Sequence, residues 1–254
     1  PRCFEIERRL KQECDIPIFH DDQHGTAIVT LAAMLNALKL TGKSLNDIEV
    51  VVNGSGAAGI AITRLLMSMG LKKVILCDTK GAIYEGRDNL NAEKAEMAKI
   101  SNLEKKKGLL KDVIVGADVF IGVSAAGVLK KSLVSKMAPN PIIFAMANPA
   151  PEIMPNEAKE AGAMIVATGR SDFANQVNNV LAFPGIFRGA LDAKATKISK
   201  EMLLAAAHAL ANCVKNPTKE KILPNPLDKS VALTIAEAVK KEAIQQKIAR
   251  EACR

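Results

Sequence analysis

The stretch that decides the fold runs from residue 48 to residue 59 and reads Ile48-Glu49-Val50-Val51-Val52-Asn53-Gly54-Ser55-Gly56-Ala57-Ala58-Gly59. Its first half is a β-branched run typical of a buried strand. A glycine-rich turn follows at once, and the apolar residues 60–69 after it indicate a helix that ends at Gly70. Residues 73–78 form a second apolar run. The sequence therefore predicts a strand-helix-strand unit of about 30 residues, the usual size of a βαβ motif.

The three glycines of the turn have separable physical roles. Gly54 permits the tight turn, Gly56 lets the backbone approach a pyrophosphate, and Gly59 lets the helix pack closely on the strand. The N–H groups of residues 55–58 would then face the phosphates at the positive end of the helix. Glycine spacing alone is a weak signal. Because a strand precedes it and an acid ends the next strand, we interpret the turn as a dinucleotide site rather than one that only packs a helix.

The acid at the end of the second strand is Asp78, which could accept hydrogen bonds from a ribose 2′-hydroxyl. Its charge would repel the 2′-phosphate of NADP, which favours NAD. Lys80, two residues further on, could neutralise such a phosphate. The expected cofactor is therefore NAD or NADP, with a slight preference for NAD.

Further apolar runs predict three more strands, at Val119–Val123, Pro141–Met146 and Ala163–Ala167. Strands of continuous apolar character that alternate with helices indicate a parallel sheet covered on both faces. We therefore expect an α/β fold, a Rossmann-like doubly wound parallel sheet with flanking helices. The helices outside this unit are expected at Cys3–Glu13, Thr26–Leu40, Ile198–Val214 and Lys229–Ala249.

Composition excludes several classes of protein. The net charge is +8, but the lysines are scattered or in short runs and aromatic residues are scarce, so we expect neither nucleic-acid nor membrane binding. No apolar run approaches the roughly 20 residues that cross a bilayer. The five cysteines form no Cys-x-x-Cys pair, which is typical of a reduced, cytoplasmic protein.

Two adjacent aspartates, Asp21 and Asp22, stand just before the predicted buried helix. Adjacent carboxylates repel one another unless a cation or a positive dipole is near. Either one of them caps the helix and the other is exposed, or one of them binds a hard divalent cation. The spacing alone leaves both interpretations open.

Polar residues also follow the later strands. Asn148 and Ser124 come directly after two predicted strands, and Asn179 lies in a segment that follows the next one. Open α/β sheets bind ligands beyond the carboxyl ends of their strands, so these side chains are candidates for lining a cofactor cleft. The simpler interpretation is that such asparagines are turn or cap residues.

Taken together, these motifs resemble the malic enzymes, and the flanking sequence is similar to the prokaryotic branch. The resemblance covers essentially the whole chain and is carried by Phe19-His20-Asp21-Asp22-Gln23-His24-Gly25-Thr26-Ala27, by the turn Asn53–Gly59, by Ala147-Asn148-Pro149, and by Asn178-Asn179-Val180 with Phe183-Pro184-Gly185. It implies oxidative decarboxylation of malate to pyruvate with NAD(P) and Mg²⁺ or Mn²⁺.

The resemblance also implies roles for single residues. Asp22 would be a metal ligand, and Asp21 the neighbouring acid that orients the proton-transfer groups. Asn148 and Asn179 would contact the substrate carboxylate and the nicotinamide. Where family members commonly carry Tyr-Pro, this chain has Phe173-Ala174.

The same resemblance places the family's general acid and base, a Tyr and a Lys, and a Glu-Asp metal pair in an N-terminal domain that we expect to be absent from this chain. The only tyrosine, Tyr84, does not match. We therefore expect residues 1–40 to carry the metal Asp, 41–190 to form the dinucleotide domain, and 191–254 to form helices packed on it. We expect a homodimer and little activity from this chain alone. A non-catalytic dinucleotide module and another hydroxy- or amino-acid dehydrogenase remain alternatives.

Overall fold

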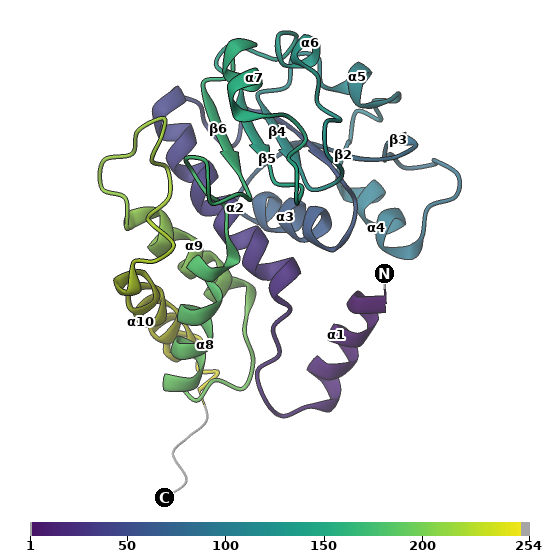
Figure 1. Ribbon diagram of the computed structural model, residues 1–254. Helices are drawn as coiled ribbons and strands as arrows, with labels where there is room; N and C mark the ends of the chain where they lie inside the picture. The colour runs from purple at the N-terminus through teal and green to yellow at the C-terminus, as the bar shows by residue number, and fades with distance from the viewer. Residues whose placement is uncertain (1, 250–254) are drawn as a thin grey trace, which may run out of the picture.

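The computed structural model describes residues 2–249, and within them lies one six-stranded sheet with helices on both faces (Figure 1). The strand order is β3-β2-β1-β4-β5-β6. Every neighbouring pair is parallel except β2 with β3. The predicted Rossmann-like sheet is thereby confirmed. The strands are β1 (Glu49–Asn53), β2 (Lys73–Asp78), β3 (Gly81–Ala82), β4 (Val119–Gly122), β5 (Ile142–Ala145) and β6 (Ile165–Thr168).

The edge strand β3 is the element of the sheet that the sequence analysis did not predict. It comprises two residues and pairs antiparallel with the end of β2, Cys77 with Ala82 and Asp78 with Gly81. Two residues are too few to show a periodic pattern, so the hydrophobic run of β2 carried no sign of this hairpin. The hairpin turns the chain back just after Asp78.

One face of the sheet is covered by short helices. Val51 and Phe120 belong to a buried cluster that includes side chains from these helices, and both residues are 0% exposed. Their neighbours in the strands, such as Val50 and Ile121, face the opposite core. The strands are therefore apolar on both sides, as a covered parallel sheet requires. The covering helices are α5 (Leu110–Val113), α6 (Lys131–Val134) and α7 (Pro155–Glu160).

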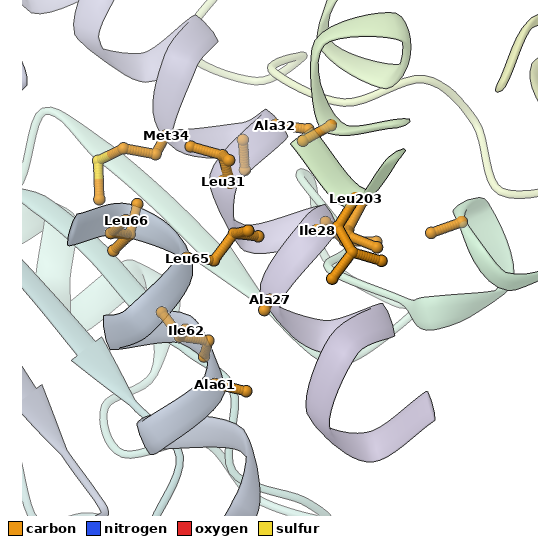
Figure 2. Close-up of a cluster of buried hydrophobic side chains, with 14 of the residues drawn as sticks. Ala27, Ile28, Leu31, Ala32, Met34, Ala61, Ile62, Leu65, Leu66 and Leu203 are labelled. Carbon is orange, nitrogen blue, oxygen red and sulfur yellow. The ribbon is translucent and has the colours of Figure 1, made fainter. Parts of the chain in front are cut away.

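The larger core fills the other face, where α2 crosses α3 and meets α9. Figure 2 shows Ile28 and Leu31 of α2 beside Leu65 of α3 and Leu203 of α9. Ala27 and Ala61 let the backbones come close, which explains how a chain poor in aromatic residues packs this layer. The helices are α2 (Asp21–Thr41), α3 (Ala57–Ser68) and α9 (Lys200–Asn212).

The remaining helices lie around this core (Figure 1). The glycines of α8 lie against α10: a Cβ on Gly189 would come within 2.4 Å of the Ala236 carbonyl. The short 3-10 helix η1 comes directly before α8 and packs against α2. The elements are α1 (Arg2–Glu13), α4 (Ala92–Ile100), η1 (Asn179–Leu181), α8 (Phe183–Asp192) and α10 (Lys229–Gln245). No helix among residues 2–249 has both the length and the apolar character that crossing a membrane requires.

Helix α2 begins at Asp21, five residues earlier than the sequence analysis predicted. His20 is the residue before the helix and makes no side-chain capping bond. The interpretation of one aspartate as the cap is therefore wrong, since Asp21 and Asp22 occupy the first turn of the helix itself. Carboxylates there are stabilised by the helix dipole, which offsets their mutual repulsion.

The turn after β1 depends on two backbone contacts. Gly54 has φ +119°, and a Cβ at that position would lie 2.4 Å from the Val123 carbonyl oxygen. A Cβ on Gly59 would lie 1.8 Å from the carbonyl oxygen of Gly54. Gly56 differs from both, because nothing lies within 4 Å of its Cβ position. Two of the glycines are therefore required by packing, while the third faces open space.

This difference predicts opposite effects of adding one methyl group. Gly59→Ala should destabilise the protein by about 2 kcal/mol or more, because overpacking against fixed backbone outweighs the gain in helix propensity. Gly56→Ala is the matched control and should change the free energy of unfolding by less than about 0.5 kcal/mol. Urea unfolding followed by circular dichroism measures both. Equal stability of the two variants would contradict the packing role of Gly59.

Candidate functional site

A cavity of about 560 Å³ opens at the carboxyl edge of the sheet. The strands β4, β5 and β6 end at it, and the first turns of α2 and α3 form its other walls. It brings together six of the twelve predicted site residues, from five separate parts of the chain. The lining residues are Asp21, Asp22, Thr26, Ala58, Val123, Ser124, Met146, Ala147, Asn148, Gly169, Val177, Asn178 and Asn179.

The glycine turn borders this cavity through Ala58, at the start of α3. Gly56 precedes the helix in an extended conformation and is exposed, whereas Ser55 and Gly59 are buried. The open space at the Gly56 Cβ position is the space that a pyrophosphate would need. The arrangement fits a dinucleotide, since unpaired N–H groups at a helix N-terminus favour anions.

Asp78 lies at the end of β2, outside this cavity, and is surrounded by positive groups. Its Oδ2 accepts hydrogen bonds from Arg87 at 2.5 Å and Lys94 at 2.6 Å, and its Oδ1 accepts one from the backbone N–H of Lys80 at 2.9 Å. Burial alone would raise the pKa of this carboxyl, but the bonds from Arg87 and Lys94 lower it to about 2. Asp78 is therefore a carboxylate held by two cations, which the sequence analysis did not foresee.

Asp21 is tied to Asn179 across the cavity wall. Asn179 Nδ2 donates to Asp21 Oδ2 at 3.1 Å, and Thr26 Oγ1 donates to Asn179 Oδ1 at 3.0 Å. Burial raises the pKa of Asp21, the hydrogen bond from Asn179 lowers it, and the charge of Asp22 raises it further. Asp21 Oδ1 is buried without a hydrogen-bond partner in the described part of the chain. That oxygen lies against Gly25, where a Cβ would come within 2.1 Å of it.

Asp22 lines the same cavity, but the oxygen ligands around it are few. Within residues 2–249 there is no group of three or more His, Cys, Asp or Glu side chains that could hold a metal ion. Mg²⁺ and Mn²⁺ prefer several oxygen ligands in a fixed geometry. The described residues therefore do not by themselves form a divalent-metal site.

Ser124 and Asn148 follow β4 and β5 and both are exposed toward the cavity. Asn53 Nδ2 donates to Ser124 Oγ at 2.8 Å, which connects the end of β1 to the loop after β4. A Cβ on Gly169 would lie 3.0 Å from Asn148 Nδ2, so the end of β6 approaches this asparagine closely. The ends of the strands therefore place both side chains at the cavity, and their contact with a cofactor stays a prediction.

Two buried acids, Glu152 beside the cavity and Glu7 of α1, were missed by the sequence analysis. Glu152 accepts hydrogen bonds from the backbone N–H groups of Ser124 and Ala147. Glu7 of α1 accepts a hydrogen bond from Gln23 at 2.9 Å, forms an ion pair with Lys11, and lies 2.6 Å from the Nε2 atom of His24. Burial would raise the pKa of Glu7, but these partners lower it to about 2. The Glu7 contacts fasten α1 to the first turn of α2.

Comparison with known proteins gives one consistent result. The family model "Malic enzyme, NAD binding domain" matches residues 23–244. The bifunctional malic/malolactic enzyme of Bacillus subtilis is 61% identical over 98% of this chain and 62% of its own length. The NADP-dependent malic enzyme of Halomonas elongata is 45% identical over 98% of this chain and 63% of its own length.

A crystal structure of the NAD-dependent malic enzyme from Thermotoga maritima superimposes with a TM-score of 0.92 at 51% identity, covering 94% of this chain and 64% of that one. The chain thus spans less than two thirds of the length of these relatives. Because the family model and the structural match both cover nearly all of the sheet and its helices, the chain belongs to the malic enzyme family and comprises the NAD-binding domain of that family.

Proposed function

We propose that this chain is the cofactor-binding portion of an enzyme that oxidises malate and decarboxylates it to pyruvate and CO₂ while reducing NAD(P). The observation that supports this most strongly is the single cavity that combines Asp21, Asp22, Asn148 and Asn179 with the N-terminus of α3. Carboxylates, amides and helix N–H groups in one cleft suit a substrate with two carboxylates beside a dinucleotide.

In this proposal the turn Gly54–Gly59 binds the pyrophosphate and Asp78 faces the adenosine ribose. Ser124, Asn148 and Asn179 orient the nicotinamide and a substrate carboxylate through hydrogen bonds. Asp21, whose Oδ1 has no partner, orients the groups that move protons. The bound nicotinamide supplies the chemistry by accepting a hydride from the carbinol carbon of malate.

The proposal of a metal ligand rests on the family resemblance alone. Asp22 would be one ligand of Mg²⁺ or Mn²⁺, as the family resemblance implies. The described residues lack a complete set of ligands for such an ion. The division into residues 1–40, 41–190 and 191–254, the homodimer and the cytoplasmic location likewise stay predictions.

For the cofactor we propose NAD or NADP, with NAD slightly favoured. One carboxylate, Asp78, stands beside two cations, Arg87 and Lys94. The local charge is therefore net positive, so repulsion of a 2′-phosphate by Asp78 is largely neutralised. The NAD-dependent relative from Thermotoga maritima and the NADP-dependent one from Halomonas elongata are consistent with this balance.

The turn can be tested by binding. Gly56→Ala should weaken NADH binding by roughly tenfold or more, because the added methyl group occupies the space of the pyrophosphate while the fold is unaffected. Isothermal titration of NADH into the 254-residue chain measures the change. Affinity equal to that of the unmodified chain would show that the dinucleotide does not lie on this turn.

The charge balance at Asp78 makes a second prediction. Asp78→Asn should lower the dissociation constant of NADPH relative to that of NADH by roughly tenfold, because the variant leaves two cations to bind the 2′-phosphate. The control is Asp118→Asn. Asp118 is also a half-buried carboxylate paired with a lysine, but it lies just before β4, at the amino ends of the strands. A lower dissociation constant of NADH relative to that of NADPH in Asp78→Asn would contradict the placement of Asp78 beside the adenosine ribose.

Catalysis is tested in the intact protein by malate-dependent reduction of NAD(P)⁺ with Mn²⁺. Asp22→Asn should reduce this rate by roughly a hundredfold and raise the Mn²⁺ concentration required. Asp47→Asn, an exposed aspartate before β1, is the control. Unchanged Mn²⁺ dependence would exclude Asp22 as a ligand. Turnover of another hydroxy or amino acid would favour a different dehydrogenase, and NADH binding without turnover would favour a non-catalytic module.

A further inference from the structure

The most deeply buried carboxylate near the cleft is that of Glu152, in the loop after β5. The residue is 0% exposed. Its Oε1 accepts hydrogen bonds from Ser124 N–H at 2.9 Å and from Ser124 Oγ at 3.4 Å, and its Oε2 accepts one from Ala147 N–H at 3.0 Å. Both contacted residues line the cavity, so the hydrogen bonds of Glu152 connect the loop after β4 to the loop after β5.

The end of β4 is shaped to admit this carboxylate. A Cβ on Gly122 would lie 2.3 Å from Glu152 Cδ and 2.5 Å from Oε1. Asn53 Nδ2 already donates to Ser124 Oγ, so the serine hydroxyl is free to donate to Glu152. One chain of hydrogen bonds therefore connects the carboxyl ends of β1, β4 and β5.

The hydrogen bonds favour the ionised form of Glu152. Every group that contacts its oxygens is a donor, and the backbone N–H groups cannot accept a proton. Burial raises the pKa of this carboxyl above its usual value, and the hydrogen bonds from Ser124 and Ala147 offset only part of that rise. No Lys, Arg or His among residues 2–249 forms an ion pair with it. Within the described chain this carboxyl is therefore held by hydrogen bonds and has no cationic partner.

The position of Glu152 relative to a bound dinucleotide follows from the order of the strands. Asp78 at the end of β2 marks the adenosine side, and the turn after β1 marks the pyrophosphate. The strand order β2-β1-β4-β5 then places the nicotinamide half over the loops that carry Ser124 and Ala147. The oxidised nicotinamide ring carries a positive charge, which hydride transfer removes.

We propose that Glu152 is a positioning residue that holds the Ser124 and Ala147 loops together and that its buried charge favours the oxidised over the reduced cofactor. This inference rests on the proposed dinucleotide function. Two unit charges about 10 Å apart at an effective dielectric constant of about 20 change a binding constant by a factor of roughly ten to twenty. A structural role alone would weaken both cofactor forms equally.

The test is the ratio of the dissociation constants for NAD⁺ and NADH, measured by isothermal titration of the 254-residue chain at pH 8. Glu152→Gln keeps the size of the side chain and removes its charge, so it should weaken NAD⁺ relative to NADH by roughly tenfold. Glu152→Asp keeps the charge but shortens the side chain, so both constants should rise by similar factors. Glu237→Gln on the exposed face of α10 is the matched control and should change neither.

Each outcome decides the proposal. A ratio within about twofold of the unmodified value in Glu152→Gln, while the unmodified chain binds both forms, overturns the role of the charge. If the unmodified chain binds neither form, the proposed cofactor function fails and this inference fails with it. If circular dichroism shows that Glu152→Gln does not fold, Glu152→Asp decides, because a shifted ratio with the charge retained would overturn the proposal.

Discussion

The carboxyl edge of the sheet depends on the close approach of α3 to the turn after β1. The Gly54 carbonyl oxygen lies 1.8 Å from where a Cβ of residue 59 would be, and the Val123 carbonyl oxygen lies 2.4 Å from the corresponding position of residue 54. No side chain stands between these backbone segments. The N-terminus of α3 is therefore fixed relative to the ends of β1 and β4. Anion binding at a helix N-terminus needs such fixed N–H groups, since a mobile helix end would lose entropy on binding.

Around this rigid centre, buried carboxylates connect loops that are distant in sequence. Asp78 gathers Arg87 and Lys94 at the end of β2, and Glu152 joins the loops after β4 and β5. A buried carboxylate is costly unless hydrogen bonds compensate for its lost hydration. Asp78 is compensated by Arg87 and Lys94, and Glu152 by two backbone N–H groups of the loops that it joins. Moving a loop would therefore leave a buried charge without its donors, which explains how loops at the edge of a sheet can hold a defined geometry.

The fold could be predicted from the sequence because its signals are local. The β-branched run before Gly54 and the apolar runs at β4, β5 and β6 need no partner to be recognised, and the observed strands lie within two residues of the predicted ones. The start of α2 was predicted too late, because the polar residues 21–25 hide its first turn. The partners of Asp78 were missed for another reason. Arg87 and Lys94 lie 9 and 16 residues further along the chain, and only the β3 hairpin brings them back.

The same limit applies to the electrostatics of the cleft. Sequence patterns singled out Asp78, Ser124 and Asn148 as candidates, but the sign of the charge at the end of β2 and below the cavity depends on contacts between distant segments. At β2 two cations outnumber one carboxylate, whereas below β4 and β5 a carboxylate has no ionic partner in the described residues. A dinucleotide is asymmetric in the corresponding sense, because its anionic groups lie on the adenosine and pyrophosphate side and its ring carries positive charge when oxidised. Under the proposed function, the positive group at the end of β2 and the carboxylate below β4 and β5 would complement the two ends of the oxidised cofactor, so that charge as well as shape would orient the ligand.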